Sequence, residues 1–172
     1  MSRTAEAPGS PPESAPESAS LARVRAEAAR LGLDIAPVHL DEGTRTAVDA
    51  ARACGCALDQ IVKSIVFRAS GSDRHLLFLT AGGNRVDPAK ASALAGLPLE
   101  KADAQGVRAA TGFAIGGVAP LGSVTPLPAW LDPRLLDFPT VWAAAGTPHD
   151  VFEVPPRTLA EAVGATVADF VA

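Results

Sequence analysis

The chain has 172 residues, of which 48% are hydrophobic, and this is enough for one well-buried core but short for two independent domains. Its 15 basic and 19 acidic residues give a formal net charge of -4, which excludes a global positive field that would attract nucleic acid non-specifically. We therefore do not expect DNA as a partner, and any contact with nucleic acid should be local.

The residue types do not favour a metal site, a disulfide framework or a membrane-spanning segment. Cys54 and Cys56 are too few for a tetrahedral zinc set or a disulfide framework, and the histidines at positions 39, 75 and 149 lack metal-ligand spacing. The first 20 residues hold no apolar run, and no later run approaches the roughly 20 apolar residues of a membrane span. We predict a cytoplasmic protein without a metal, a cofactor or a membrane partner.

The first third of the chain predicts a tail followed by helices. Residues 1–19 are nearly all Ser, Pro, Ala, Glu and Gly, which cannot bury enough apolar surface to offset chain entropy, so we predict a disordered tail there. One globular domain should cover residues 20–172. Ser20 can cap a first helix that Gly32 ends. A short strand over 35–40 should follow.

A strand pair is expected next. Thr44 can cap a second helix that ends near Gly55. The segment Gln60-Ile-Val-Lys-Ser-Ile-Val-Phe67 is rich in β-branched residues and predicts a strand. Residues 75–81 form another apolar run, and the five residues Ala-Ser-Gly-Ser-Asp just before it are typical of a hairpin turn. The two strands should therefore be antiparallel.

The second half alternates short helices with short strands. Asp87 should cap a helix that Gly96 ends, and Asp103 should cap one that stops at Gly112. Three short strands and a last helix, opened by a proline, complete the chain: 129–131, 140–144, 151–154 and Pro156 onward. Because no steady βαβ order appears, these elements predict a mixed or antiparallel α+β domain.

Lys63 is a single charge in the middle of an apolar strand. Side chains alternate between the faces of a strand, so Lys63 shares a face with Ile65 and Phe67, while Ser64 points the other way. Both faces are mostly apolar, which indicates a covered strand whose ammonium needs a carboxylate, a cavity or a ligand. The alternative is an edge strand on which an exposed lysine blocks edge-to-edge pairing.

A glycine-rich segment runs from Thr111 to Gly122. It lacks both the Gly-Lys-Ser/Thr ending of a nucleotide P-loop and the Gly-x-Gly-x-x-Gly of a dinucleotide fold. Paired glycines let backbone amides approach a ligand, and the following Pro120 stiffens the segment, which suits a rim that holds a small polar group. The alternative is an ordinary surface loop, since glycine clusters mostly mark turns.

No pair of a nucleophile and its base is recognisable. Ser64 and Lys63 are adjacent, but neighbouring strand residues face opposite sides, so they cannot easily act as such a pair. Ser123, Thr111 and Thr80 have no histidine partner that the sequence identifies.

Several short motifs together carry a family resemblance. In chain order they are Gln60-x-x-Lys63-Ser64, Asp87 at a helix start, Thr111-Gly112, Gly116-Gly117-x-x-Pro120-Leu-Gly122 and Ala-Ala-Gly146. In this order and spacing, over roughly residues 33–172, the chain resembles the YbaK family. Members of this family are free-standing relatives of the editing domain that is inserted in bacterial prolyl-tRNA synthetases.

The resemblance implies a fold, an activity and a site. The fold would be a mixed, largely antiparallel α+β one, with a curved, barrel-like sheet surrounded by short helices. The activity would be that of an aminoacyl-tRNA deacylase acting in trans, with Lys63 as the catalytic residue that reaches the aminoacyl-adenosine end of the tRNA. The implied substrate-binding residues are Ser64, Thr111, Gly112, Gly116, Gly117, Val118, Pro120 and Gly146.

The resemblance also implies partners, and it has limits. The expected substrate is a small amino acid such as Cys, Ala or Ser, carried by tRNAPro, and prolyl-tRNA synthetase is a further expected partner. Many relatives have a tyrosine in the early strand, and a serine with a basic residue near position 146, and this chain has neither. The alternative functions are a non-catalytic module that binds aminoacyl-tRNA or a synthetase, and an esterase of small molecules.

Overall fold

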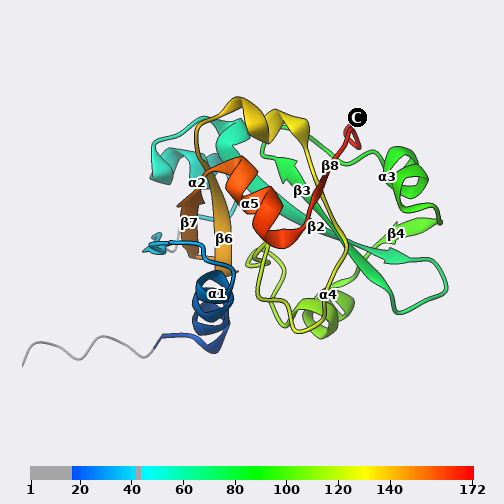
Figure 1. Ribbon diagram of the computed structural model, residues 1–172, viewed down its shortest axis with the longest axis horizontal. Coiled ribbons are helices and arrows are strands. Elements are labelled where there is room, and N and C mark those ends of the chain that lie inside the picture. The colour runs from blue at the N-terminus through cyan, green and yellow to red at the C-terminus, as the bar shows by residue number, and fades with distance from the viewer. Residues whose placement is uncertain (1–16, 42–43) are drawn as a thin grey trace, which may run out of the picture.

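The structure is a computed structural model that describes residues 17–41 and 44–172, so the predicted tail lies outside it up to position 16. Within these ranges one open sheet is surrounded by helices (Figure 1). The helices are α1 (Ala19–Arg30), α2 (Ala47–Cys54), α3 (Pro88–Ala95), α4 (Ala104–Thr111) and α5 (Pro156–Val163), with 3-10 turns η1 (Leu58–Gln60) and η2 (Pro133–Asp137). The strands are β1 (Val38–His39), β2 (Ile61–Ala69), β3 (His75–Ala81), β4 (Leu99–Lys101), β5 (Ala129–Leu131), β6 (Val141–Thr147), β7 (Asp150–Val154) and β8 (Thr166–Val167).

The sheet runs in the order β1-β7-β6-β2-β3-β5-β8, and β4 pairs with β2 outside this path. Pairings between β1 and β7, β6 and β7, β2 and β3, and β2 and β4 are antiparallel, whereas β2–β6, β3–β5 and β5–β8 are parallel. The predicted mixed, largely antiparallel α+β fold is confirmed. The sheet does not close on itself, because its path begins at β1 and ends at β8.

Helix caps follow the predicted residue types, but the first two are shifted by two residues. Ser18, not Ser20, caps α1, and Thr46, not Thr44, caps α2 in a capping box with Asp49. The cap is the residue whose backbone is still extended when its side chain meets the first-turn amides, and sequence spacing does not decide between neighbouring hydroxyl residues. The later caps, Asp87 and Asp103, are as predicted.

Strand predictions succeeded where the apolar pattern was strong. The antiparallel pair of β2 and β3 is confirmed, with Lys63 opposite Thr80. The strand expected over 35–40 shrinks to β1, and the one expected over 140–144 extends to Thr147. β4 and β8 were not predicted, because they are short, carry exposed residues and are held by pairing with β2 and β5.

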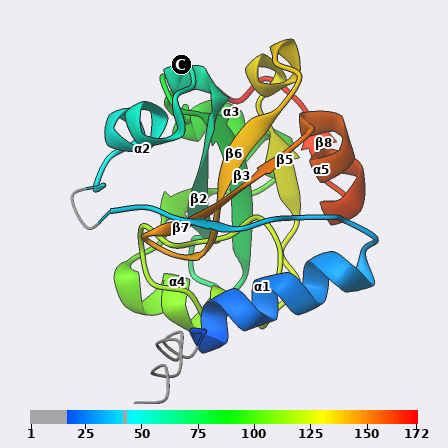
Figure 2. The same cartoon turned by 90° about the vertical axis from the view of Figure 1, so that its left-hand side faces the viewer.

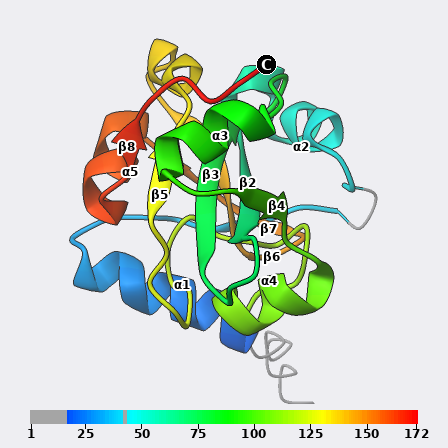
Figure 3. The same ribbon diagram turned by 90° about the vertical axis from the view of Figure 1, so that its right-hand side faces the viewer.

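Apolar clusters cover both faces of the central strands. The larger cluster takes Val62 and Val66 from β2, together with residues of α1, α4 and α5. The smaller one joins Phe67 and Phe78 to α3 and Phe170, and Figure 3 shows α3 on the side of β2 and β3 that faces the viewer. The prediction of a strand covered on both faces is confirmed.

β2 is a central strand with one open stretch. β3 follows one edge of it, while on the other edge β6 pairs with residues 61–62 and β4 pairs with residues 67–69. The edge-strand alternative for Lys63 is therefore wrong. Between these pairings, no strand of the described ranges covers the backbone of residues 63–66 on the second edge.

No helix in the part of the chain that the structure describes is long and apolar enough to cross a membrane.

Candidate functional site

A cavity of about 720 Å³ lies beside the open stretch of β2. In Figure 2, α2 lies above this part of β2 and α4 below it, while β7 passes in front. The cavity is lined by both ends of this open stretch, by α2, by the hairpin that joins β6 and β7, and by the glycine-rich segment. Of the predicted site residues, it brings together Lys63, Ser64, Gly116 and Val118.

Lys63 is half-buried, and its ammonium Nζ donates a hydrogen bond to the backbone carbonyl of Asn84. Burial lowers the pKa of Lys63 below its ordinary value, and the nearby Arg85 adds to this effect. The carboxylates of Asp132 and Asp59 oppose it by favouring the charged form. Of the alternatives that the sequence left open for this lysine, a carboxylate, a cavity or a ligand, the structure shows a cavity, together with nearby carboxylates that form no direct ion pair with it in the described ranges.

The turn that holds Lys63 is itself held by carboxylates. Asp59 Oδ1 accepts from the Gly83 amide at 2.9 Å, and Asp132 Oδ2 accepts from Asn84 Nδ2 at 2.9 Å. Asp132 is only 1% exposed, and it also accepts from the Ala81 amide at 3.1 Å. A Cβ on Gly82 would clash with the Leu58 carbonyl oxygen, so a side chain there would force the turn or Leu58 to shift.

Ser64 offers the cavity both its side chain and its backbone. Its Oγ is buried and has no hydrogen-bond partner among the described residues. The Val66 carbonyl points toward β4, because it accepts from the Ala102 amide at 3.1 Å. Backbone groups alternate in direction along a strand, so the N–H and C=O of Ser64 point to the same open edge as the carbonyl of Val66.

The glycine-rich segment contributes residues to the lining of the same cavity. Gly116 and Val118 line it, and their N–H groups bond to no other residue of the described ranges. The Gly117 amide is occupied, because it donates to the Ala114 carbonyl at 3.0 Å. A Cβ on Gly117 would lie 2.8 Å from Thr147 Cα, so the loop packs directly on the β6–β7 hairpin.

The other predicted residues lie behind the cavity wall. Thr111 is fully buried, and its Oγ1 donates to the Val107 carbonyl at 2.6 Å. Gly112 ends α4 with a φ of 76°, and Gly146 has a φ of 100°. A Cβ on Gly146 would lie 2.8 Å from the Ser20 carbonyl oxygen. These residues and the buried Pro120 shape the segments that line the cavity without lining it themselves.

The structure adds His149, which lay outside the predicted site. It lines the cavity, and its Nδ1 is buried without a partner in residues 17–41 and 44–172. Next to it, Asp150 Oδ1 bonds His39 Nδ1 at 2.9 Å, and Asp150 Oδ2 accepts from Thr147 Oγ1. The sequence pattern did not indicate this histidine, because the three histidines lack the spacing of metal ligands. A polar hairpin tip, Thr147-Pro148-His149-Asp150, right after an apolar strand was the signal that could have found it.

Metal ligation finds no support in the described ranges, which contain no group of three or more His, Cys, Asp or Glu side chains that could hold an ion. The polar groups that line the cavity are the ammonium groups of Lys63 and Lys101, the guanidinium of Arg45, the imidazole of His149, and hydroxyls such as that of Ser64.

Relatives of known structure share the whole fold. A proposed trans-editing enzyme for prolyl tRNA synthetase is 46% identical, with a TM-score of 0.86 over 91% of this chain and 99% of that one. The hypothetical protein APE2540 is 29% identical, with a TM-score of 0.81 over 87% of this chain and 99% of that one.

Sequence comparison points to the same family. The uncharacterized protein YwhH of Bacillus subtilis (strain 168) is 32% identical over 123 residues, which are 72% of this chain and 78% of that protein. A family model described as the aminoacyl-tRNA editing domain matches residues 41–162. The resemblance expected from the sequence is thereby confirmed, and the chain belongs to the aminoacyl-tRNA editing domain family.

Proposed function

We propose that this protein is a trans-acting deacylase that hydrolyses the ester bond of mischarged aminoacyl-tRNA. One observation carries the proposal: in a chain of the editing-domain family, one cavity is lined by a strand lysine, an open strand edge and loop residues whose amides have no partner among the described residues. We infer that residues 20–172 form the one domain with this activity. Its support is that the buried clusters draw on residues from Val24 to Phe170.

The cavity suggests a mechanism built on positioning. The amides of Gly116 and Val118 would donate to the ester carbonyl and stabilise the oxyanion that develops when a water, or the substrate's own hydroxyl or thiol, attacks it. Lys63 would bind the ribose or phosphate of the terminal adenosine as a cation. Loss of one oxyanion donor should lower the rate by about 100-fold or more.

Ser64 and His149 would hold the amino-acid part. The open carbonyl of Ser64 can accept from the α-ammonium group, and the free Nδ1 of His149 can accept from that group or from the attacking water. The side-chain atoms Ser64 Oγ and His149 Nδ1 are buried without a hydrogen-bond partner in the described part of the chain, and a bound substrate would supply one.

The substrate would be a small amino acid on tRNAPro. The solved relative proposed to act in trans for prolyl tRNA synthetase supports this tRNA, and it also supports prolyl-tRNA synthetase as a partner. Ala143, Ala144 and Trp142 line the cavity on the β6 side and leave room for alanine, serine or cysteine. Proline would have to be excluded sterically, because apolar contacts discriminate by only about 1–3 kcal/mol per methylene.

The test is deacylation of tRNAPro charged with alanine, serine, cysteine or proline by the wild type and by Lys63→Ala. Lys90→Ala is the matched control, because Lys90 is an exposed lysine on α3 that pairs with Asp169 at 3.1 Å, away from the cavity. We expect one small misacylated species to be cleaved, proline to be spared and only the Lys63 variant to be inactive. A wild type that binds and protects these esters would instead identify a non-catalytic tRNA-binding module.

A further inference from the structure

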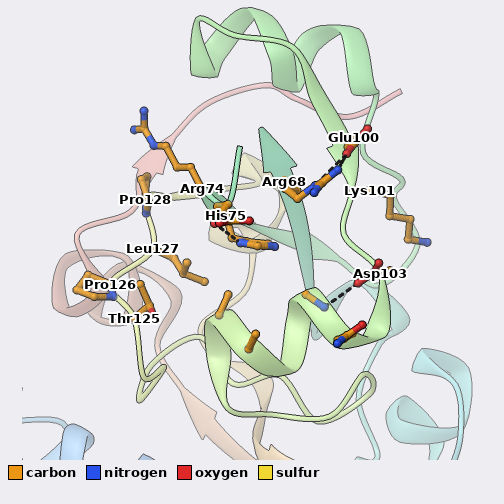
Figure 4. A pocket seen from close by; sticks show the side chains of 15 residues that line it. Arg68, Arg74, His75, Glu100, Lys101, Asp103, Thr125, Pro126, Leu127 and Pro128 are labelled. Carbon is orange, nitrogen blue, oxygen red and sulfur yellow. Dashed lines mark hydrogen bonds and ion pairs between the residues drawn. The ribbon is translucent and has the colours of Figure 1, made fainter. Parts of the chain in front are cut away.

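A second cavity, of about 750 Å³, lies on the other side of β4 and α4 (Figure 4). It is enclosed by the β2–β3 hairpin, β4, α4 and the segment 125–128. Lys101, at the end of β4, lines both cavities. Along α4, Val107 lines the first cavity while Gly106 and Ala110 line the second, so one short element separates them.

Cations stand at the rim of this second cavity. In Figure 4, Arg74 and Lys101 lie on opposite sides of it. Neither forms an ion pair with another residue of the described ranges, whereas Arg68 pairs with Glu100. The two remaining carboxylates are those of Asp103, which accepts from the Gly106 amide at 2.7 Å, and of Asp73, in the exposed hairpin turn.

The walls between these cations contain one aromatic ring and are otherwise partly apolar. His75 lies at the centre of Figure 4, and its Nδ1 bonds the Asp73 carbonyl oxygen at 2.8 Å. A carbonyl oxygen only accepts, so Nδ1 is the protonated nitrogen and the ring is fixed in place. Opposite it lie Leu127 and two prolines of the segment 125–128. An aromatic ring between cations is an arrangement with which proteins stack a base and neutralise the phosphates of a single strand.

We propose that the second cavity receives the cytidines that precede the terminal adenosine of tRNA. This inference rests on the proposed function, because it requires that the ester in the first cavity be attached to a polynucleotide. A strand that leaves the first cavity past Lys101 enters the second. Carboxylates such as those of Asp103 and Glu100 are the acceptors that pair with the exocyclic amino group of cytosine.

The same arrangement explains how a chain with a formal net charge of -4 holds a polyanion. The cations that matter are placed where the strand passes, and a global positive field is not needed. Binding through so few phosphates has a shallow salt dependence. On a single strand, the logarithm of affinity falls with the logarithm of salt concentration, with a slope of about -0.7 per phosphate contact.

The test compares three esters that differ only in length: alanyl-adenosine, the alanyl trinucleotide CCA and alanyl-tRNAPro. In the wild type, kcat/KM should rise by at least about fivefold from adenosine to CCA, which is the lower end of what one stacked base contributes. Arg74→Glu and Lys101→Glu should remove most of this gain, and each should make the salt slope for CCA shallower by about 0.7. Arg157→Glu is the matched control, because Arg157 is exposed on α5, which lies away from α4 in Figure 3.

The outcomes separate the two proposals. If the wild type cleaves alanyl-adenosine but gains nothing from the added cytidines, or if the gain survives in both charge-reversal variants, the second cavity is not a nucleotide site. If the wild type cleaves none of the three esters, while it also spares those of serine and cysteine, the proposed deacylase function fails and this inference fails with it.

Discussion

The ammonium of Lys63 donates to the backbone carbonyl of Asn84, a residue that lies 21 positions further along the chain. The Asn84 side chain in turn donates to the buried carboxylate of Asp132 at 2.9 Å. The place of the lysine in the cavity is thus set by a turn, and this turn is held by the carboxylate of Asp132, the residue that caps η2.

Asp132→Asn should shift the alkaline limb of the pH–rate profile to lower pH. In the proposed mechanism Lys63 acts as a cation, so activity should fall as the pH rises through its pKa, which burial and Arg85 already hold below the ordinary value. The Asp132 charge raises this pKa, and its removal lowers the pKa further. The measurement is the rate of enzymatic deacylation against pH, corrected for spontaneous hydrolysis. Asp137→Asn, in the exposed part of η2, is the control, and an unmoved limb in a folded Asp132 variant would contradict the prediction.

Gly82→Ala should destabilise the fold and misplace Lys63. The new Cβ would lie 2.2 Å from the Leu58 carbonyl oxygen, and relief of such overpacking costs about 1–3 kcal/mol. Gly71→Ala is the control, because a Cβ at this position meets nothing within 4 Å. Its only cost is the backbone strain of an alanine at a φ of 74°, about 1 kcal/mol. Urea denaturation measures both free energies of unfolding, and equal losses would show that the contact with Leu58 is readily relieved.

Gly117→Ala should reduce kcat far more than it reduces stability. Its Cβ would lie 2.7 Å from the Thr147 carbonyl carbon, so the loop must move away from the hairpin and carry the amides of Gly116 and Val118 with it. A displacement of about 1 Å at a reacting group can cost on the order of 100-fold in rate. Single-turnover deacylation and thermal unfolding should be measured together. A variant with normal kcat would show that the loop amides take no part in the chemistry.

Ser64→Ala should lower activity without lowering stability. The Ser64 Oγ is buried and bonds to nothing in the described part of the chain, so its removal leaves no other group unsatisfied. We expect an unchanged or higher melting temperature, together with a kcat/KM reduced by about fivefold to tenfold if the hydroxyl binds the substrate, as one lost hydrogen bond implies. Val62→Ala is the comparison, since it removes a buried core group from the same face of β2 and should lower the melting temperature. Full activity in Ser64→Ala would show that the Ser64 hydroxyl does not bind the substrate.

The sequence by itself determined the local features. The apolar patterns predicted β2 and β3 as an antiparallel pair, and Asp87, Asp103 and their glycine partners predicted the ends of α3 and α4. The alternation of side chains also predicted that Lys63 and Ser64 face opposite sides of a covered strand. These features follow from residues close together in the chain, whose spacing is fixed by backbone geometry.

The tertiary structure alone decided what surrounds the site. The open stretch of β2 exists because β6 pairs with it at one end and β4 at the other. Asp132 reaches Asn84, and His149 reaches the cavity, only after strands that are distant in the chain come together. Such pairings depend on the register of the whole sheet and on how the core packs. The spacing of neighbouring residues determines neither of these.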